Sequence, residues 1–239
     1  MRKERLDKVL SNMGVGSRKE VKEMVKAGMV TVNGKVMKAS DFKVDVEGDE
    51  IVCGGKTIRY REFIYLQMNK PKDLVSSTDD PRDSTVIELL DDFHRNFRPF
   101  PVGRLDKDTE GLLLITNDGK LAHDLLSPKK KVDKTYHATI EGRLTDEHVE
   151  EFSRGILLDD GYHTLPAQLN IISSGPVSAA EITIQEGKYH QVKRMVAALG
   201  MRVSYLKRIR MGPLYLDESL EPGQYRELTE EEIRLLLDR

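Results

Sequence analysis

A charged loop that runs into an apolar strand is the part of this 239-residue chain best suited to chemistry. Asp106, Asp108 and Glu110 alternate along the loop, and Arg104 precedes them. Charge beside a buried strand is unfavourable unless it is paired or faces a ligand, so the loop is a candidate edge of an active site. A carboxylate placed there could act as a nucleophile or as a general base. The local pattern alone also fits a charged turn without function.

Several motifs, taken in order, carry a family resemblance. The segment GRLDKDTEGLLLITNDG, at residues 103–119, resembles the signature of the pseudouridine synthases of the RsuA/RluA superfamily. Asn69-Lys70-Pro71 before it, and Lys134-Thr135-Tyr136 and GKYHQVKRM (residues 187–195) after it, match in the order that the family requires. The resemblance implies an enzyme that isomerises uridine in RNA and needs no metal or organic cofactor. It also implies that Asp106 is the catalytic carboxylate.

The implied reaction breaks the N1–C1′ bond of uridine, turns the bound uracil and joins its C5 to C1′. It requires an ionised carboxylate near C1′, a base for the C5 proton and a pocket that excludes water. Asp106 would attack the sugar carbon or abstract a sugar proton, and both routes stay open. Asp108 follows two positions later and could face the same side of an extended loop. The family motif selects Asp106.

The resemblance gives supporting roles to other residues. A carboxylate in a dry pocket takes up a proton unless a cation stays close, and Lys193 stands where the family places a Lys or Arg against the aspartate, with Arg194 as the next choice. Tyr136 matches an active-site tyrosine of the family that lies against the uracil and is a candidate for removal of the C5 proton. A phenol is a poor base at neutral pH, so ring packing is its safer role. Arg104 could hold a phosphate while the base leaves its stack.

Each of these residues also has a plainer interpretation. Lys193 could be a surface lysine, Tyr136 a half-buried strand tyrosine, and Arg104 a partner of a neighbouring acid. His190 is expected to form hydrogen bonds near the site, because the six histidines show no metal-ligand spacing. Asp73 stands where the family often has glycine, so the turn after the Asn-Lys-Pro motif could differ.

The N-terminal region is a small basic module. The periodicity of apolar residues predicts a helix over residues 6–13, and Ser17 with Glu20 has capping-box spacing for a second helix. Asn33-Gly34 favours a tight hairpin. Residues 48–60 are expected to form a closing strand and a linker. This order resembles the S4 RNA-binding domain over about residues 2–50.

Charge supports RNA binding by this module. The first forty residues carry ten cations and four anions, although the whole chain has a net charge of -2 and becomes acidic from Asp217 onward. Local patches govern attraction to phosphate, and such contacts give affinity with little base specificity. The predicted RNA-binding residues combine this module with two positions of the catalytic region: Arg2, Arg5, Arg18, Lys19, Lys22, Lys26, Arg104 and Arg194.

The remaining pattern predicts an α+β fold. Strand-like and helical runs follow one another without steady alternation, which favours a mixed, largely antiparallel sheet with flanking helices. We expect an S4-like domain with its linker at residues 1–60 and a catalytic domain at residues 61–239. Predicted strands cover residues 63–68, 112–116, 136–140, 168–172, 179–184 and 203–209. Predicted helices cover residues 86–90, 120–125, 146–154, 192–199 and 230–237.

Composition sets the cellular context that we expect. No apolar run is long enough to span a bilayer, and no signal segment opens the chain. Cys53 is the only cysteine, which excludes an internal disulfide and a cysteine-rich metal site. The expectation is a cytoplasmic monomer with no membrane partner.

The expected substrate is ribosomal RNA. KYHQVKRM, the S4-like module and the closing GQYRELTEEEI resemble the RsuA branch, which acts on small-subunit (16S) ribosomal RNA, so that RNA or a small-subunit assembly intermediate is the first choice. Large-subunit (23S) RNA is the alternative. A non-catalytic S4-type RNA-binding protein is a second alternative. A glycosidase with paired carboxylates ranks last, because acids so close on one loop cannot easily flank a sugar.

Overall fold

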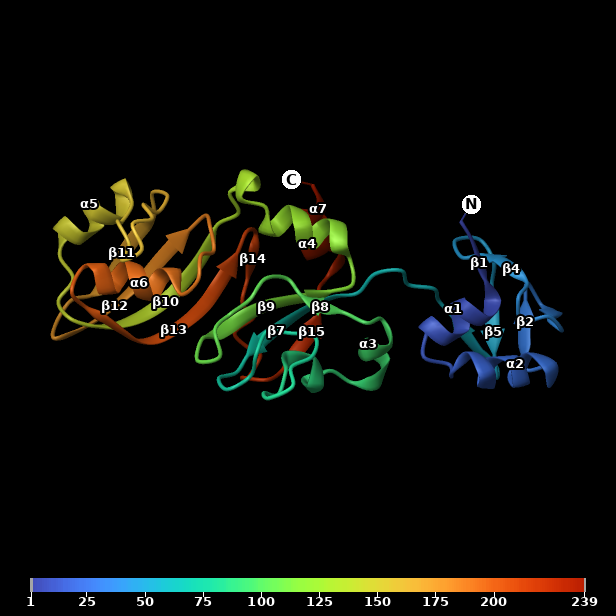
Figure 1. Cartoon of the computed structure of the whole chain (residues 1–239). Coiled ribbons are helices and arrows are strands. Elements are labelled where there is room, and N and C mark those ends of the chain that lie inside the picture. The colour runs from blue at the N-terminus through green and yellow to red at the C-terminus, as the bar shows by residue number, and fades with distance from the viewer. Residues whose placement is uncertain (1, 239) are drawn as a thin grey trace. The chain divides into compact units, whose positions relative to one another are not determined.

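The computed structural model describes residues 2–238 and divides the chain into two compact units. The first comprises the chain up to Ile64 together with Leu90–Pro99, and the second comprises Tyr65–Leu89 together with the chain from Phe100 onward (Figure 1). The predicted α+β class is confirmed, with helices and mostly antiparallel sheets in the described chain. Over residues 2–238, every helix is too short or too polar to cross a membrane.

The first unit packs two short helices on small sheets. Helices α1 (Leu6–Asn12) and α2 (Arg18–Lys26) bury their apolar stripes, including Leu6, Leu10 and Val21, in one core. A four-stranded antiparallel sheet, in the order β3-β2-β5-β6, supplies the other side of that core. The remaining elements of this unit are β1 (Lys3–Arg5), β2 (Val30–Val32), β3 (Lys35–Val36), β4 (Lys43–Asp45), β5 (Ile51–Cys53), β6 (Lys56–Ile58) and α3 (Asp92–Asn96).

Local chemistry accounts for most turns of this unit. The Ser17–Glu20 capping box is present, and Asn33-Gly34 connects β2 to β3 with both residues at positive φ, so both predictions are confirmed. The predicted linker is wrong in part, because Gly54-Gly55 turns β5 into β6 and so keeps residues 56–58 in the sheet. Helix α3 was not predicted, since only five residues support it. Domain boundaries at residues 60 and 61 stay a prediction.

The second unit is built on a nine-stranded sheet. Its main path runs β11-β12-β10-β13-β9-β7-β15, while β14 pairs with β13 and β8 pairs with β9. The predicted strands are present, most of them longer than expected. The strands are β7 (Tyr65–Lys70), β8 (Phe100–Pro101), β9 (Glu110–Thr116), β10 (Lys134–Glu141), β11 (Gln168–Ser173), β12 (Val177–Ile184), β13 (Arg202–Met211), β14 (Leu214–Tyr215) and β15 (Tyr225–Glu227).

The parallel contact between β9 and β13 positions the charged loop. Its register sets Glu110 beside Lys207 and Gly111 beside Arg208. Gly111 has φ +103, and a Cβ there would lie 2.3 Å from the main-chain oxygen of Arg208. Only glycine allows the two strands to approach so closely at this point. The loop at residues 104–109 therefore enters the sheet beside β13.

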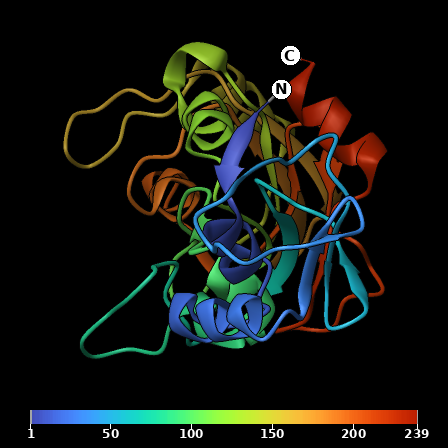
Figure 2. The ribbon, with the colours of Figure 1, turned by 90° about the vertical axis from the view of Figure 1, so that its right-hand side faces the viewer.

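Helices cover the sheet in two places. Helices α5 (Asp146–Arg154) and α6 (Gln191–Ala198) lie with the β10–β13 part of the sheet (Figure 1). Helices α4 (Gly119–Leu126) and α7 (Glu230–Leu237) lie at the top of Figure 1 and Figure 2 and share a core with β9. The predicted helix at residues 86–90 is instead the 3₁₀ turn η1 (Val86–Leu89), and a second such turn is η2 (Pro128–Lys130).

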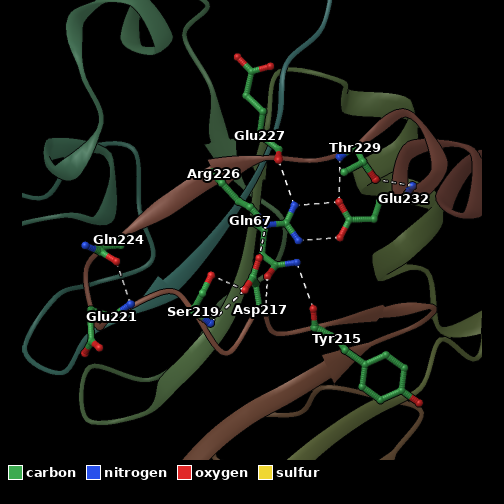
Figure 3. Close-up of polar contacts among 10 residues, drawn as sticks. All are labelled: Gln67, Tyr215, Asp217, Ser219, Glu221, Gln224, Arg226, Glu227, Thr229 and Glu232. Carbon is green, nitrogen blue, oxygen red and sulfur yellow. Dashed lines mark hydrogen bonds and ion pairs between the residues drawn. The ribbon is translucent and has the colours of Figure 1, made fainter.

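One arginine connects the C-terminal helix to the edge of the sheet. Arg226 on β15 donates to Asp217 at 2.6 Å and to both carboxylate oxygens of Glu232 at 2.8 Å (Figure 3). Glu232 also closes the capping box of α7 with Thr229. The hydrogen bonds to Glu232, followed by the bond to Asp217, raise the pKa of Arg226 against the opposing effect of burial. This network orders the segment between β14 and α7.

Candidate active site

The carboxylate of Asp106 lies against a lysine ammonium. Lys193 on α6 donates from Nζ to Asp106 Oδ2 at 3.0 Å and to Asp108 Oδ1 at 2.6 Å. These residues are far apart in sequence, and the packing of α6 on β13 brings them together. The Asp106 side chain is 28% exposed, whereas that of Asp108 is 70% exposed. The carboxylate of Asp106 is therefore partly open to solvent, and the expectation of a dry carboxylate is not met.

The electrostatics favour the charged forms of Lys193 and Asp108. Burial opposes the charge on Lys193, but its hydrogen bonds to Asp108 and Asp106 outweigh that cost and raise its pKa. The bond from Lys193 in turn lowers the pKa of Asp108 against the opposing effect of burial. Both carboxylates thus share one ammonium that stays protonated at neutral pH.

A buried lysine holds the main chain of the same loop. Lys70, at the end of β7, is 0% exposed. Its Nζ donates to the main-chain oxygens of Pro71 (2.9 Å), Thr109 (3.0 Å) and Asp106 (3.2 Å), with a weaker contact to Lys107 at 3.4 Å. Burial lowers the pKa of Lys70 to about 8, although nearby acids oppose that shift. We expected the Asn-Lys-Pro motif to have a structural role, and Lys70 of this motif holds the main chain of the loop.

Two further contacts fix the loop. The Ser76 hydroxyl lies 3.1 Å from both the main-chain oxygen and the main-chain nitrogen of Leu105. The amide of Asp73 donates to the main-chain oxygen of Lys107 at 2.8 Å. Asp73 has φ 67, in the left-handed region that glycine tolerates best and that aspartate adopts more readily than most residues. The turn thus has a glycine-like backbone despite the substitution.

The register of the sheet sets Tyr136 near the same loop. Tyr136 on β10 pairs with Arg208 on β13, and Arg208 pairs with Gly111 on β9. Both Tyr136 and Arg208 are buried, at 8% and 2% exposure. Arg208 donates from Nε to the main-chain oxygen of Leu112 at 2.8 Å, while its Nη2 has no hydrogen-bond partner among the described residues. Sequence reasoning missed Arg208, since an arginine in a basic strand is ordinarily exposed.

The other residues predicted in the catalytic region differ in their surroundings. His190, which precedes α6, has its Nε2 3.5 Å from Asp106 Oδ1. Arg104 is exposed, and within residues 2–238 no ion pair to it is found, so the alternative pairing with Asp108 or Glu110 is absent. Arg194 pairs with Asp159 and lies 2.7 Å from Asp160. Its guanidinium is thus already partnered.

Part of the basic module is also paired internally. Arg2 contacts Glu4 and Glu62, Arg5 donates to Asp7, and Lys26 lies 3.4 Å from Glu23. The pairs of Arg2 and Lys26 are largely exposed and therefore weak, so phosphate can compete for these two cations. Asp7 is buried and accepts two hydrogen bonds from Arg5, so that pair is firmer. The remaining three predicted contacts lie along α2 and have no ion pair within residues 2–238: Arg18, Lys19 and Lys22.

Comparison with known proteins finds relatives over nearly the whole chain. The family model for RNA pseudouridylate synthases matches residues 64–198, and that for the S4 domain matches residues 4–51. The chain is 52% identical to an RNA pseudouridine synthase of Bacillus subtilis, covering 97% of this chain and 98% of that protein. It is 45% identical to ribosomal small subunit pseudouridine synthase A of Vibrio cholerae, covering 96% and 97%.

A solved structure has a similar fold over nearly the whole chain. A crystal structure of a pseudouridylate synthase superposes with a TM-score of 0.68 at 37% identity, covering 97% of this chain and 99% of the other. The family model spans more than half of the chain, and the curated relatives align from end to end. The chain therefore belongs to the RNA pseudouridylate synthase family, carries an S4 domain and is a pseudouridine synthase.

Proposed function

We propose that this enzyme converts a uridine of small-subunit (16S) ribosomal RNA to pseudouridine with Asp106 as the catalytic carboxylate. The observation that carries the proposal is the contact of Lys193 with Asp106, which sets an ammonium against this carboxylate. The named activity of the Vibrio cholerae relative supports the choice of small-subunit RNA. Large-subunit RNA is the alternative substrate, with the same reaction at the same residues.

Each group has a stated task in this proposal. Asp106 attacks C1′ or removes a sugar proton, the N1–C1′ bond breaks, and the uracil turns while it stays bound. C5 then bonds to C1′ as the Asp106 carboxylate leaves that carbon or, on the second route, as the removed proton returns to the sugar. The C5 proton is lost, and N1 takes up a proton. Lys193 donates to the carboxylate of Asp106 and orients it toward the sugar. Tyr136 packs against the turning uracil, and Arg104, which has no ion pair within residues 2–238, contacts a phosphate beside the extruded nucleotide.

The basic module supplies affinity in the proposal. Cations along α2 contact phosphates of folded RNA and place the target near the catalytic unit. Arg18, Lys19 and Lys22 carry most of this role, because ion pairs already engage Arg2, Arg5 and Lys26. Arg194 contributes to the RNA contact only if phosphate displaces its two aspartates.

Tritium release tests the proposal directly. Small-subunit and large-subunit RNA, transcribed without modifications and labelled with [5-³H]uridine, are each incubated with the protein. Only isomerisation exchanges the C5 hydrogen, so release from small-subunit RNA alone is expected, and the modified position is then mapped by carbodiimide and primer extension. Release only from large-subunit RNA would select the alternative.

Two matched substitutions test the assigned carboxylate. Asp106→Asn should bind the RNA and release no tritium, because an amide neither attacks C1′ nor removes a proton. Asp108→Asn should retain activity within about tenfold, since Asp108 is 70% exposed and loses only one charge-assisted bond. Turnover by Asp106→Asn would contradict the assignment.

A further inference from the structure

Two aromatic rings follow one another outward from the Asp106 carboxylate. His190 Nε2 lies 3.5 Å from Asp106 Oδ1. The ring of Tyr189 stacks on the ring of His190, with centroids 3.8 Å apart and planes inclined by 17°. Tyr189 is nevertheless 74% exposed, so the ring face that His190 does not cover is accessible. Single exposed aromatics are common on protein surfaces, but a ring stacked in series with an active-site carboxylate is a more specific arrangement.

Buried side chains hold this pair of rings in place. Gln191, only 4% exposed, accepts from the amide of Lys188 at 2.9 Å and donates to Glu186 at 2.8 Å. Glu186 is itself buried and also accepts from the amide of Leu165. His190 has φ 48, a left-handed conformation that a non-glycine residue keeps only when its surroundings impose it. The stacking face is therefore formed before any ligand arrives, which reduces the ordering cost of binding.

We propose that Tyr189 is a stacking platform for the base of the nucleotide adjacent, in the RNA strand, to the uridine that is isomerised. The inference rests on the proposed function, because it needs the target uridine at Asp106. A uridine that leaves a helix deprives its neighbour of a stacking partner, and an aromatic face can replace that contact. The platform lies one imidazole away from the carboxylate, where a flanking nucleotide must pass.

The platform is a positioning group. Tyr189 reaches Asp106 only through His190, so it acts on where the RNA lies and leaves the bond changes to the catalytic group. Stacking tolerates every base, because each has a π-face. Removal of the ring should thus weaken binding, raising KM, and should leave kcat at saturating RNA nearly unchanged.

The experiment combines protein variants with missing bases. An RNA fragment carrying the mapped uridine is prepared intact, with an abasic site immediately 5′ of the uridine, and with one immediately 3′. Wild-type protein, Tyr189→Ala, Tyr189→Phe and Tyr215→Ala are assayed on each. Tyr215 is the matched control, since it is an exposed tyrosine at 62% whose ring faces Arg210 instead of the site.

On intact RNA, Tyr189→Ala should raise KM by roughly 5- to 150-fold, the range expected for loss of one stacked base. Tyr189→Phe and Tyr215→Ala should stay within about threefold of wild type. On the RNA that lacks the stacked base, wild type and Tyr189→Ala should have the same KM. On the other abasic RNA, the KM of Tyr189→Ala should still exceed that of wild type. The platform role would be overturned if Tyr189→Ala raised KM equally on all three RNAs, if it left KM unchanged on intact RNA, or if it lowered kcat alone. A wild-type protein that modifies no ribosomal RNA would instead overturn the proposed function.

Discussion

Lys70 Nζ donates to the main-chain oxygen of Asp106 across 3.2 Å, so a fully buried ammonium holds the backbone of the proposed catalytic residue. The same ammonium bonds the main-chain oxygens of Pro71 and Thr109. Three donors of one group thereby connect the main chain of the loop at Asp106 and Thr109 to the segment after β7. Lys193 then orients the carboxylate itself. One lysine thus positions the main chain, and the other positions the side chain.

Replacement of Lys70 by methionine should separate activity from stability. The loop loses its central donor, so kcat should fall at least about tenfold through misplacement of Asp106. The free energy of unfolding should change by less than about 2 kcal/mol, because relief of the buried charge offsets the lost hydrogen bonds. Single-turnover rates and denaturant unfolding measure the two effects, and amide exchange at residues 105–110 should accelerate. Unchanged turnover with slow exchange would contradict the positioning role.

The lowered pKa of Lys70 should also affect how the free energy of unfolding depends on pH. Its pKa is lowered to about 8 by burial, whereas a lysine of the unfolded chain titrates near ~10.4. Between these values the unfolded chain binds the extra proton, so this group makes the free energy of unfolding rise with pH by up to about 1.4 kcal/mol per unit. Below pH 8 both states are protonated and the dependence vanishes. The free energy of unfolding of wild type and of Lys70→Met is measured with urea from pH 7 to 10, and the difference between the two proteins isolates the effect. A difference that does not change with pH would refute the prediction.

Lys193 should be required as a cation. Lys193→Met removes charge-assisted bonds to two carboxylates, and kcat should fall by roughly 10- to 150-fold. Lys193→Arg retains the charge and should stay within about tenfold of wild type. Lys107→Met serves as control, because it removes an ammonium of the same loop that pairs with exposed Asp83. Tritium release at saturating RNA measures all three, and equal losses in Lys193→Met and Lys107→Met would contradict the assignment.

The basic module should act on affinity alone. Lys22→Glu combined with Lys26→Glu reverses two exposed charges of α2, so RNA affinity should fall and the salt slope of log Kd should flatten by roughly one unit per lost contact. Turnover at saturating RNA should be unchanged. Lys22→Arg with Lys26→Arg keeps the charge and provides the control. Filter binding between 50 and 200 mM salt, the range over which such contacts change strongly, measures the effect, and an unaltered slope would exclude docking through these lysines.

The Arg226 network should contribute to the stability of the C-terminal segment. Arg226→Lys retains the charge but loses the bidentate bond to Glu232 and the simultaneous hydrogen bond to Asp217 (Figure 3). The free energy of unfolding should therefore fall by about 1–2 kcal/mol. Arg202→Lys is the control, because its bidentate pair with Glu141 is largely exposed and should contribute little to stability. Denaturant unfolding compares them. Equal effects would show that the network adds nothing beyond an exposed pair.

Local patterns predicted much of this protein. The Ser17–Glu20 box, the Asn33-Gly34 turn and the helices at residues 146–154 and 230–237 depend on neighbours in sequence, and the structure has all four. The resemblance identified the family from ordered motifs, and the comparisons confirm it. The helix expected at residues 86–90 is only a 3₁₀ turn, because so short an apolar run does not determine which helix type forms.

The sequence by itself therefore determined the family, the α+β class and the short-range elements, since these rest on residue types and on contacts within a few positions. Tertiary structure alone decided that Lys70 bonds the loop's carbonyls, that Lys193 is shared between two aspartates, and that Tyr189 stacks on His190. Lys193 lies 87 positions from Asp106 in the chain. Distances of this kind depend on how β9, β13 and α6 pack, and no local pattern encodes the register and approach of strands far apart in sequence.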